Sequence, residues 1–152
     1  MKTEIINRIL SENELTKTVF LGAYPCDVIG EIHGAAPYAI IVNTDNSKKV
    51  GSHWTLVFFS EENVYFFDSF GRNFDDLEMF PRDFVKYMKI YIGNKKSKYN
   101  PKIVQSLLGD TCAEYCMYWL VCRCMNVTNI LKPFSNNLKS NDFIVKQFVN
   151  NL

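Results

Sequence analysis

The chain has 152 residues, a length that fits one domain with a single well-buried core, and we expect residues 1–152 to form one domain. Hydrophobic residues make up 47% of the sequence and aromatic residues 14%, which excludes an intrinsically disordered chain. The formal net charge of +1 excludes a strong general attraction to nucleic acid or to an anionic membrane surface.

The first half of the chain predicts one helix and three strands. Residues 3–14 carry isoleucine and leucine at helical spacing, which predicts a short amphipathic helix over one side of the core. Residues 19–32 are interrupted by two glycines and a proline and predict irregular chain that lines a cleft. Residues 38–43 predict a strand, and residues 53–59 and 63–68 predict a hairpin that is covered on both faces.

The second half predicts mostly helices. Residues 74–92 are partly helical in pattern, and Pro81 suits the first turn of that helix. Residues 94–100 predict a polar, lysine-rich loop, and residues 103–105 predict a further short strand. Residues 140–152 have apolar side chains at helical spacing and predict a last helix that packs on the domain.

A cysteine stands where a core helix is predicted to begin. Thr111 and Glu114 match the capping box, in which both side chains bind free backbone N–H groups at a helix start. Cys112 is then the first helical residue, and residues 113–125 are apolar on nearly every side, as in a helix that runs through the core. The positive end of the helix dipole favours a thiolate at Cys112, which is the state of a nucleophile.

The predicted hairpin places an acid beside a histidine. His53 starts its first strand and Asp68 ends its second, so both lie at the same end of the sheet. Together with Gln105 and Cys112 they provide the groups that acyl transfer requires, namely a thiolate, an imidazole, a carboxylate that orients it, and an amide N–H for the oxyanion. The backbone N–H of Cys112 is the candidate for a second oxyanion donor.

Each of these residues also has a structural explanation. A lone cysteine on an apolar helix is most often a core residue, and a histidine at a strand start is often only packed. Asp68 suits an Asx turn, and Gln105 suits a solvated strand end. The joint pattern favours a catalytic site, whereas His33, in a glycine-flanked loop, is expected to be structural. Cys26 lies in a predicted loop and is expected to be exposed, which leaves a redox or partner role open, although a passive thiol is its simplest interpretation.

The other cysteines do not suggest a metal site or a disulfide framework. The five cysteines are an odd number, and the sequence has no signal-peptide pattern and no apolar run of about 18 residues. We therefore expect a soluble, intracellular protein with reduced thiols and no membrane contact. No C-x-x-C pair occurs and there are two histidines, so no metal is expected.

Three motifs together resemble a known family. They are His53-Trp54 shortly after Gly51, the run Asp68-Ser69-Phe70-Gly71, and Gln105 seven residues before Cys112. This set resembles the adenain class of adenovirus-type cysteine proteases, which is related to the proteases of ubiquitin-like proteins. Residues 20–24 and 41–44 also resemble adenain segments, so that the resemblance spans about residues 18–125.

The resemblance implies a role for each site residue. Cys112 is the nucleophile, His53 the base and acid, Asp68 the residue that orients the histidine, and Gln105 an oxyanion donor. Trp54 shapes the substrate-binding cleft beside the histidine. The implied fold is α+β and papain-like or adenain-like, with a central helix that carries the cysteine and packs on a mixed β-sheet.

The resemblance also implies a function, with two alternatives left open. It implies an endopeptidase that cleaves capsid or other virion precursor proteins at small-residue, glycine-containing sites during virion maturation, in a virophage or a polinton-like virus. Such an enzyme would be located in the virion and the host-cell interior, and we expect it to be a monomer. The first alternative is an isopeptidase for a ubiquitin-like modifier, which would use the same four residues. The second is a binding or scaffold protein that kept the fold without catalysis.

The sequence departs from adenovirus protease in several respects. Asp68 stands where that enzyme has a glutamate, and either acid can orient an imidazole. The adenovirus enzyme is activated by a disulfide-linked peptide and by DNA, but the corresponding place near Gly93 has no cysteine and the net charge is almost neutral. We therefore expect no cofactor, we transfer neither activator, and we leave a role for nucleic acid open.

Overall fold

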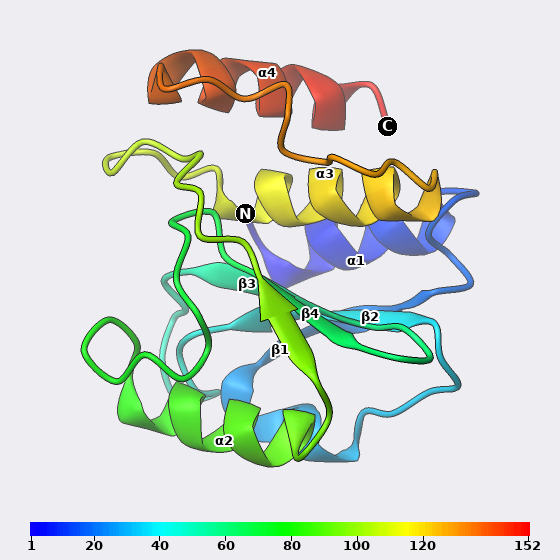
Figure 1. Cartoon of the computed structure of the whole chain (residues 1–152), viewed down its shortest axis with the longest axis vertical. Helices are drawn as coiled ribbons and strands as arrows, with labels where there is room; N and C mark the ends of the chain where they lie inside the picture. The colour runs from blue at the N-terminus through cyan, green and yellow to red at the C-terminus, as the bar shows by residue number, and fades with distance from the viewer.

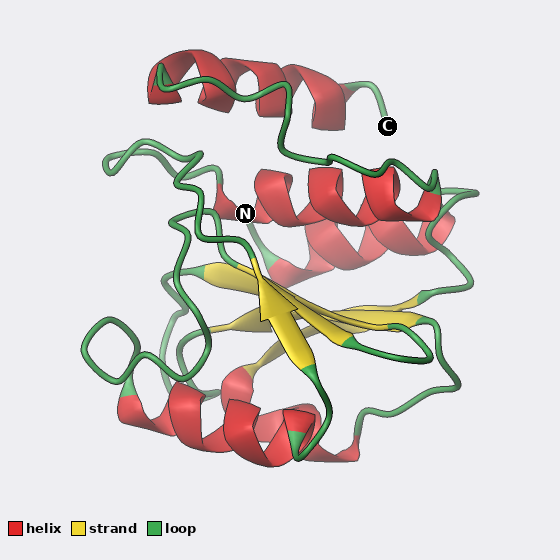
Figure 2. Ribbon diagram, viewed as in Figure 1, coloured by secondary structure: helices red, strands yellow, loops and turns green.

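The computed structural model describes residues 1–152, and its centre is one five-stranded sheet with helices on both faces (Figures 1 and 2). The strands are, in chain order, β1 (Phe20–Pro25), β2 (Tyr38–Asn43), β3 (Trp54–Phe59), β4 (Val64–Phe67) and β5 (Ser97–Tyr99). Strand β1 is parallel to β2, strands β2, β3 and β4 pair antiparallel, and β5 is parallel to β4. The sheet is therefore mixed, and the predicted α+β fold is confirmed.

Helices cover the two faces of this sheet. They are α1 (Thr3–Glu12), the 3₁₀ helix η1 (Cys26–Glu31), α2 (Arg82–Ile92), α3 (Cys112–Cys124) and α4 (Leu138–Asn150). Helices α1 and α3 lie on one face, α4 packs on the outer side of α3, and α2 with η1 covers the opposite face (Figure 1). None of these helices combines the length and the apolarity that crossing a bilayer requires.

The alternating side chains of β3 supply two separate cores. Leu56 and Phe58 point to the face that α1 and α3 cover, whereas Val57 and Phe59 point to the face that α2 covers. Because both faces are covered, every residue of β3 is buried, as the apolar side chains on both alternate and intervening positions predicted. The predicted hairpin of β3 and β4 is confirmed, and it fixes the end of the sheet at which His53 and Asp68 lie.

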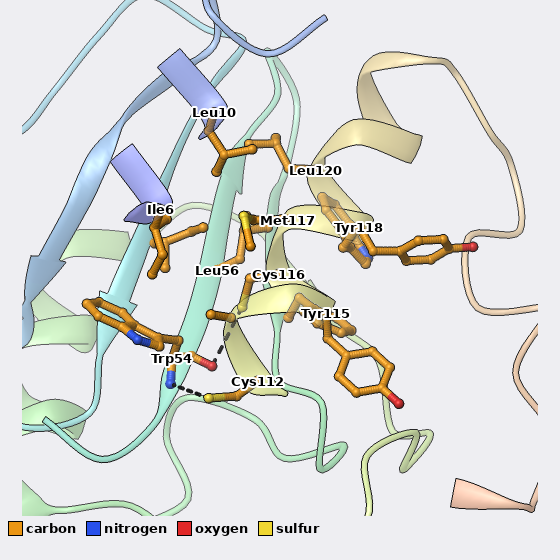
Figure 3. Packing of buried hydrophobic residues seen from close by; sticks show 14 of the residues in the cluster. Ile6, Leu10, Trp54, Leu56, Cys112, Tyr115, Cys116, Met117, Tyr118 and Leu120 are labelled. Carbon is orange, nitrogen blue, oxygen red and sulfur yellow. Dashed lines mark hydrogen bonds between the residues drawn. The ribbon is translucent and has the colours of Figure 1, made fainter. Parts of the chain in front are cut away.

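Helix α3 runs through the larger core, as its composition predicted. Ten of its thirteen residues are buried, and its inner face packs on β3 and α1 (Figure 3). The Sγ of Cys116 donates a hydrogen bond to the carbonyl of Trp54 at 3.6 Å. Cys116 is therefore a packed core thiol, and burial holds its pKa well above the ordinary value.

The prediction of irregular chain for residues 19–32 was wrong. They form edge strand β1 and helix η1, because β2 offers a hydrogen-bonding partner that local composition does not reveal. An edge strand tolerates both breakers: Gly22 has a φ of +134° where the pairing register shifts, and Pro25 ends the strand. The expected exposure of Cys26 was also wrong, since it is fully buried and burial raises its pKa to about 11.

Three other local predictions were wrong in detail. The lysine-rich loop contains strand β5, because the backbone of β4 pairs with it regardless of its exposed side chains. Residues 103–105 form no strand, because the backbone N–H groups of Val104 and Gln105 both donate to the single carbonyl of Ser69, at 3.0 and 3.3 Å. Pro81 is the residue before helix α2 and does not lie in its first turn.

A tight turn after β4 gives a test of the fold. Gly71 has a φ of +73°, and a Cβ placed on it would lie 2.5 Å from the carbonyl oxygen of Pro101. We expect Gly71→Ala to lower the free energy of unfolding by about 1–3 kcal/mol, since it adds both backbone strain and a backbone clash. Gly30 is the matched control, because a Cβ placed on it would have no neighbouring atom within 4 Å.

Urea denaturation of the two variants measures this difference. Gly30→Ala should change the free energy of unfolding by no more than about 0.5 kcal/mol. An equal effect of the two substitutions would show that the close approach of Gly71 to Pro101 is absent in solution.

Candidate active site

Helix α3 begins at Cys112 as predicted, but the capping box was wrong. The Thr111 hydroxyl donates to Oδ1 of Asp142 at 3.1 Å, so it does not cap the helix. The carboxyl of Glu114 makes no capping bond either, its Oε2 is buried without a partner, and burial raises its pKa. The aspartate on α4 competes successfully for the threonine, which no pattern within residues 111–114 reveals.

The thiol of Cys112 lies against the start of β3. Its Sγ accepts a hydrogen bond from the backbone N–H of Trp54 at 3.4 Å (Figure 3). This N–H and the N-terminus of α3 both direct partial positive charge at the sulfur. The residue is 7% exposed, so little of it is open to solvent.

His53 is held between an acid and the thiol. Its Nε2 lies 2.5 Å from Oδ1 of Asp68, and the ring stacks on Phe70 with 5.2 Å between the ring centroids. Burial by itself lowers the pKa of His53, but hydrogen bonds and negative charge from Asp68 and Cys112 outweigh burial and raise it to about 9. Since Nε2 is bound to the acid, Nδ1 is the ring nitrogen that Asp68 leaves available to another partner.

The acid has a second partner that sequence reasoning missed. Asp68 is fully buried, and its Oδ2 accepts hydrogen bonds from Nε of Arg72 at 2.7 Å and from the Arg72 backbone N–H at 3.2 Å. Burial raises the pKa of Asp68, but the donors from His53 and Arg72 outweigh burial and hold it below its usual value. The sequence does contain one indication of this ion pair, because Arg72 lies four residues after Asp68 in the turn that follows β4.

Gln105 has a fixed side-chain amide and is not a solvated strand end. It is 1% exposed, its Oε1 accepts from the hydroxyl of Ser69 at 2.5 Å, and its Nε2 donates to the carbonyl of Gly109 at 2.9 Å. An amide nitrogen carries two hydrogens, so one N–H is left for another acceptor. Ser69 follows Asp68 directly, and the same turn therefore holds both the acid and the amide.

The predicted site residues lie together around one cavity. His53, Trp54, Gln105 and Cys112 line a cavity of about 900 Å³, while Asp68 lies behind the histidine. Residues 1–4 form another part of the cavity wall, because the indole Nε1 of Trp54 donates to the carbonyl of Met1 at 3.1 Å. The Trp54 side chain is 8% exposed and belongs to the core that α1 and α3 cover.

The remaining histidine is remote from this site. The Nε2 of His33 donates a hydrogen bond to the carbonyl of Gly30 at 2.8 Å, and its ring stacks on Tyr91. The five cysteines are all free thiols, and among them only Cys112 lines the cavity beside His53.

Comparisons with known proteins find similarity in structure but not in sequence. No protein-family model and no curated protein matches the chain. Among solved structures, the crystal structure of the ASFV pS273R protease is similar, with a TM-score of 0.61 at 15% sequence identity. The match covers 95% of this chain and 65% of the viral protease, so the chain spans about two thirds of that protein. A selenomethionine structure of the same protease aligns with a TM-score of 0.47 and 17% identity, over 74% of this chain and 44% of that one.

At this identity the likeness concerns the fold. The helix that begins at Cys112 and packs on the mixed sheet belongs to an architecture that a viral protease also has. The chemistry of the site rests on the distances around His53 and on the residue types that make them.

The raised pKa of His53 can be measured directly. We expect the ring to titrate at about 9 in the wild type. In Asp68→Asn the negative charge is gone while the ring stays buried, so its pKa should fall toward the ordinary value of about 6.5. An NMR pH titration of the imidazole resonances measures both values, with His33 as the only other histidine to assign.

A matched substitution controls for the change of charge. Asp75 is exposed and accepts no hydrogen bond, so Asp75→Asn should leave the titration of His53 unchanged. A His53 pKa that stays near 9 in Asp68→Asn would refute the role of this acid.

Proposed function

We propose that the chain is a cysteine endopeptidase in which Cys112 is the nucleophile and His53 the general acid and base. One observation carries the proposal: the His53 ring is bound by buried Asp68 on one nitrogen and lines the same cavity as Cys112, which lies at the start of a helix. Asp68 orients the ring and supports its positive charge. The raised pKa of His53 means that the imidazolium is available beside the thiolate at neutral pH.

The geometry supports a two-stage acyl transfer. The Cys112 thiolate attacks the carbonyl carbon of the substrate peptide, a C–S bond forms, and the carbonyl oxygen takes the electron pair. The free N–H of Gln105 and the backbone N–H of Cys112 stabilise this oxyanion. When the C–N bond breaks, the leaving amine takes the proton from Nδ1 of His53.

Water completes the cycle at the resulting thioester. His53 is now neutral and accepts a proton from the water molecule that attacks the acyl carbon. The C–S bond breaks, the carboxylic acid leaves, and the thiolate and imidazolium are restored. The Trp54 N–H contact with Sγ stabilises the thiolate at the beginning and the end of this cycle.

We propose viral precursor proteins as the substrates, cleaved at small-residue sites that contain glycine, inside the infected cell and the assembling virion. Support comes from the fold, which is similar to that of a viral protease. Residues 1–4 and residues of the segment before Cys112 line the same cavity as Cys112, and a substrate held between them would need small side chains next to the cut. The proposed enzyme acts as a monomer and needs neither a metal nor an organic cofactor.

Alkylation tests the thiolate and imidazolium pair without a substrate. We expect iodoacetamide to label Cys112 readily at about pH 6, where an ordinary thiol with a pKa of about 8.5 is almost fully protonated. His53→Ala should slow this labelling at least about tenfold, since it removes the positive partner of the thiolate. Mass spectrometry locates and quantifies the label.

Cys124 is the internal reference for this experiment. It is partly exposed and burial raises its pKa, so it should stay unlabelled at about pH 6 in both proteins. Equal labelling of Cys112 with and without His53 would remove the basis of the proposal. It would instead favour a binding or scaffold protein that has the fold alone.

Cleavage assays separate the two possible protease functions. We expect the wild type to cut purified virion precursor proteins after or beside small residues, and Cys112→Ala to be inactive, because no other group near His53 can form the thioester. A folded ubiquitin-like protein fused to a reporter should remain intact. Efficient release of that reporter, with precursors left uncut, would favour an isopeptidase for a ubiquitin-like modifier.

A further inference from the structure

The segment before helix α3 has little apolar anchorage. Residues 105–111 form no helix or strand, and the side chains at the tip, Leu107 and Leu108, are 83% and 101% exposed. A segment that buries so little apolar surface depends on polar contacts for a single conformation. This same segment carries Gln105 at one end and leads into Cys112 at the other.

Helix α4 supplies these polar contacts through one carboxylate. Asp142 accepts hydrogen bonds from the hydroxyl and the backbone N–H of Ser106, the latter at 3.4 Å. It also accepts from the hydroxyl of Thr111 at 3.1 Å and from that of Tyr115 at 2.8 Å. The carboxylate therefore binds both ends of the segment and the first turn of α3, and it does so from 27 to 36 residues further along the chain.

Gly109 links Asp142 to the side-chain amide of Gln105. The backbone of Gly109 lies so close that a Cβ there would be 2.7 Å from Oδ2 of Asp142 and 2.8 Å from Oγ of Ser106. The carbonyl of Gly109 in turn accepts the hydrogen bond from Nε2 of Gln105 at 2.9 Å. A shift of the segment would therefore move the acceptor that orients this amide.

The residue beside Asp142 strengthens the same attachment. The side chain of Asn141 donates to the carbonyl of Val104 at 3.1 Å and is fully buried. The hydroxyl of Tyr115 also lies 2.8 Å from that carbonyl. The chain is thus fixed to helix α4 immediately before Gln105, and Asp142 fixes the segment from Ser106 to Thr111.

We propose that Asp142 is a positioning residue of the active site, which holds residues 105–111 so that Gln105 and the N–H of Cys112 face the developing oxyanion. This inference rests on the proposed peptidase function for its catalytic consequence, but the positioning itself does not depend on it. A carboxylate suits the task because it only accepts hydrogen bonds and can bind several donors at once. An amide of the same shape keeps only one oxygen, so its NH2 group would take the place of an acceptor at the other position.

The test compares Asp142→Asn with Asp75→Asn, which removes the same charge from an exposed position that accepts no hydrogen bond. We expect Asp142→Asn to speed hydrogen–deuterium exchange of the amides in residues 105–112, while the rest of the chain and the Asp75→Asn protein exchange as the wild type does. We also expect kcat for a cleaved precursor peptide to fall about tenfold or more with KM within about twofold, because the oxyanion forms only in the transition state.

Alkylation of Cys112 by iodoacetamide provides a readout that a general loss of structure would change. Alkylation displaces iodide at a carbon atom and forms no oxyanion, so Asp142→Asn should keep the wild-type alkylation rate at about pH 6 while kcat falls.

Gly109→Ala tests the contact between the segment and Asp142 by a change in the segment itself. Its methyl group should displace the segment from Asp142 and give the same combination of faster exchange, lower kcat and unchanged alkylation.

The outcomes separate this inference from the proposed function. Unchanged exchange of residues 105–112 in Asp142→Asn overturns the positioning role, whatever the activity. Faster exchange with wild-type kcat overturns its catalytic consequence. If the wild type cleaves no precursor while exchange still rises, the proposed function fails and the structural role of Asp142 remains supported.

Discussion

The structure around the site depends on one buried negative charge. An ionised carboxylate without partners is very costly to bury, and Asp68 is fully buried. It is balanced by the imidazole of His53 on one oxygen and by Arg72 on the other, and Arg72 is itself packed over the ring of Phe80. Movement of either partner would leave the charge uncompensated. The histidine therefore keeps its orientation because turning away would leave a buried charge on Asp68 uncompensated. The turn after β4 holds Asp68 in place.

That turn also connects two parts of the molecule that lie far apart in sequence. Asp68 reaches back to the beginning of the hairpin, while its neighbour Ser69 binds the side chain and the backbone N–H of Gln105. The far side of the Gln105 segment is held by helix α4, so the segment lies between two rigid supports. The turn after β4 and helix α4 thus position the polar groups around the thiol of Cys112, although neither of them contains that cysteine.

Sequence reasoning worked where the pattern is local. The hairpin and helix α3 were predictable because a covered strand or a core helix carries its apolar pattern within a few residues. Strands β1 and β5 were missed because both are edge strands, whose existence depends on the backbone of a neighbour and hardly on their own side chains. The capping box failed for a related reason: Thr111 found a better acceptor on a helix that begins far along the chain.

The sequence by itself determined the residue types of the site and their order, because the thiol at a helix start and the acid at a hairpin end are properties of adjacent residues. Only the tertiary structure decided how those groups are held. The hydroxyl of Ser69 against the amide of Gln105, the backbone of Trp54 against Sγ of Cys112, and Asp142 behind residues 105–111 are contacts between separate elements. Hydrogen bonds act over about 3 Å, so which of the many possible donors meets which acceptor is fixed only when the sheet and its helices pack together.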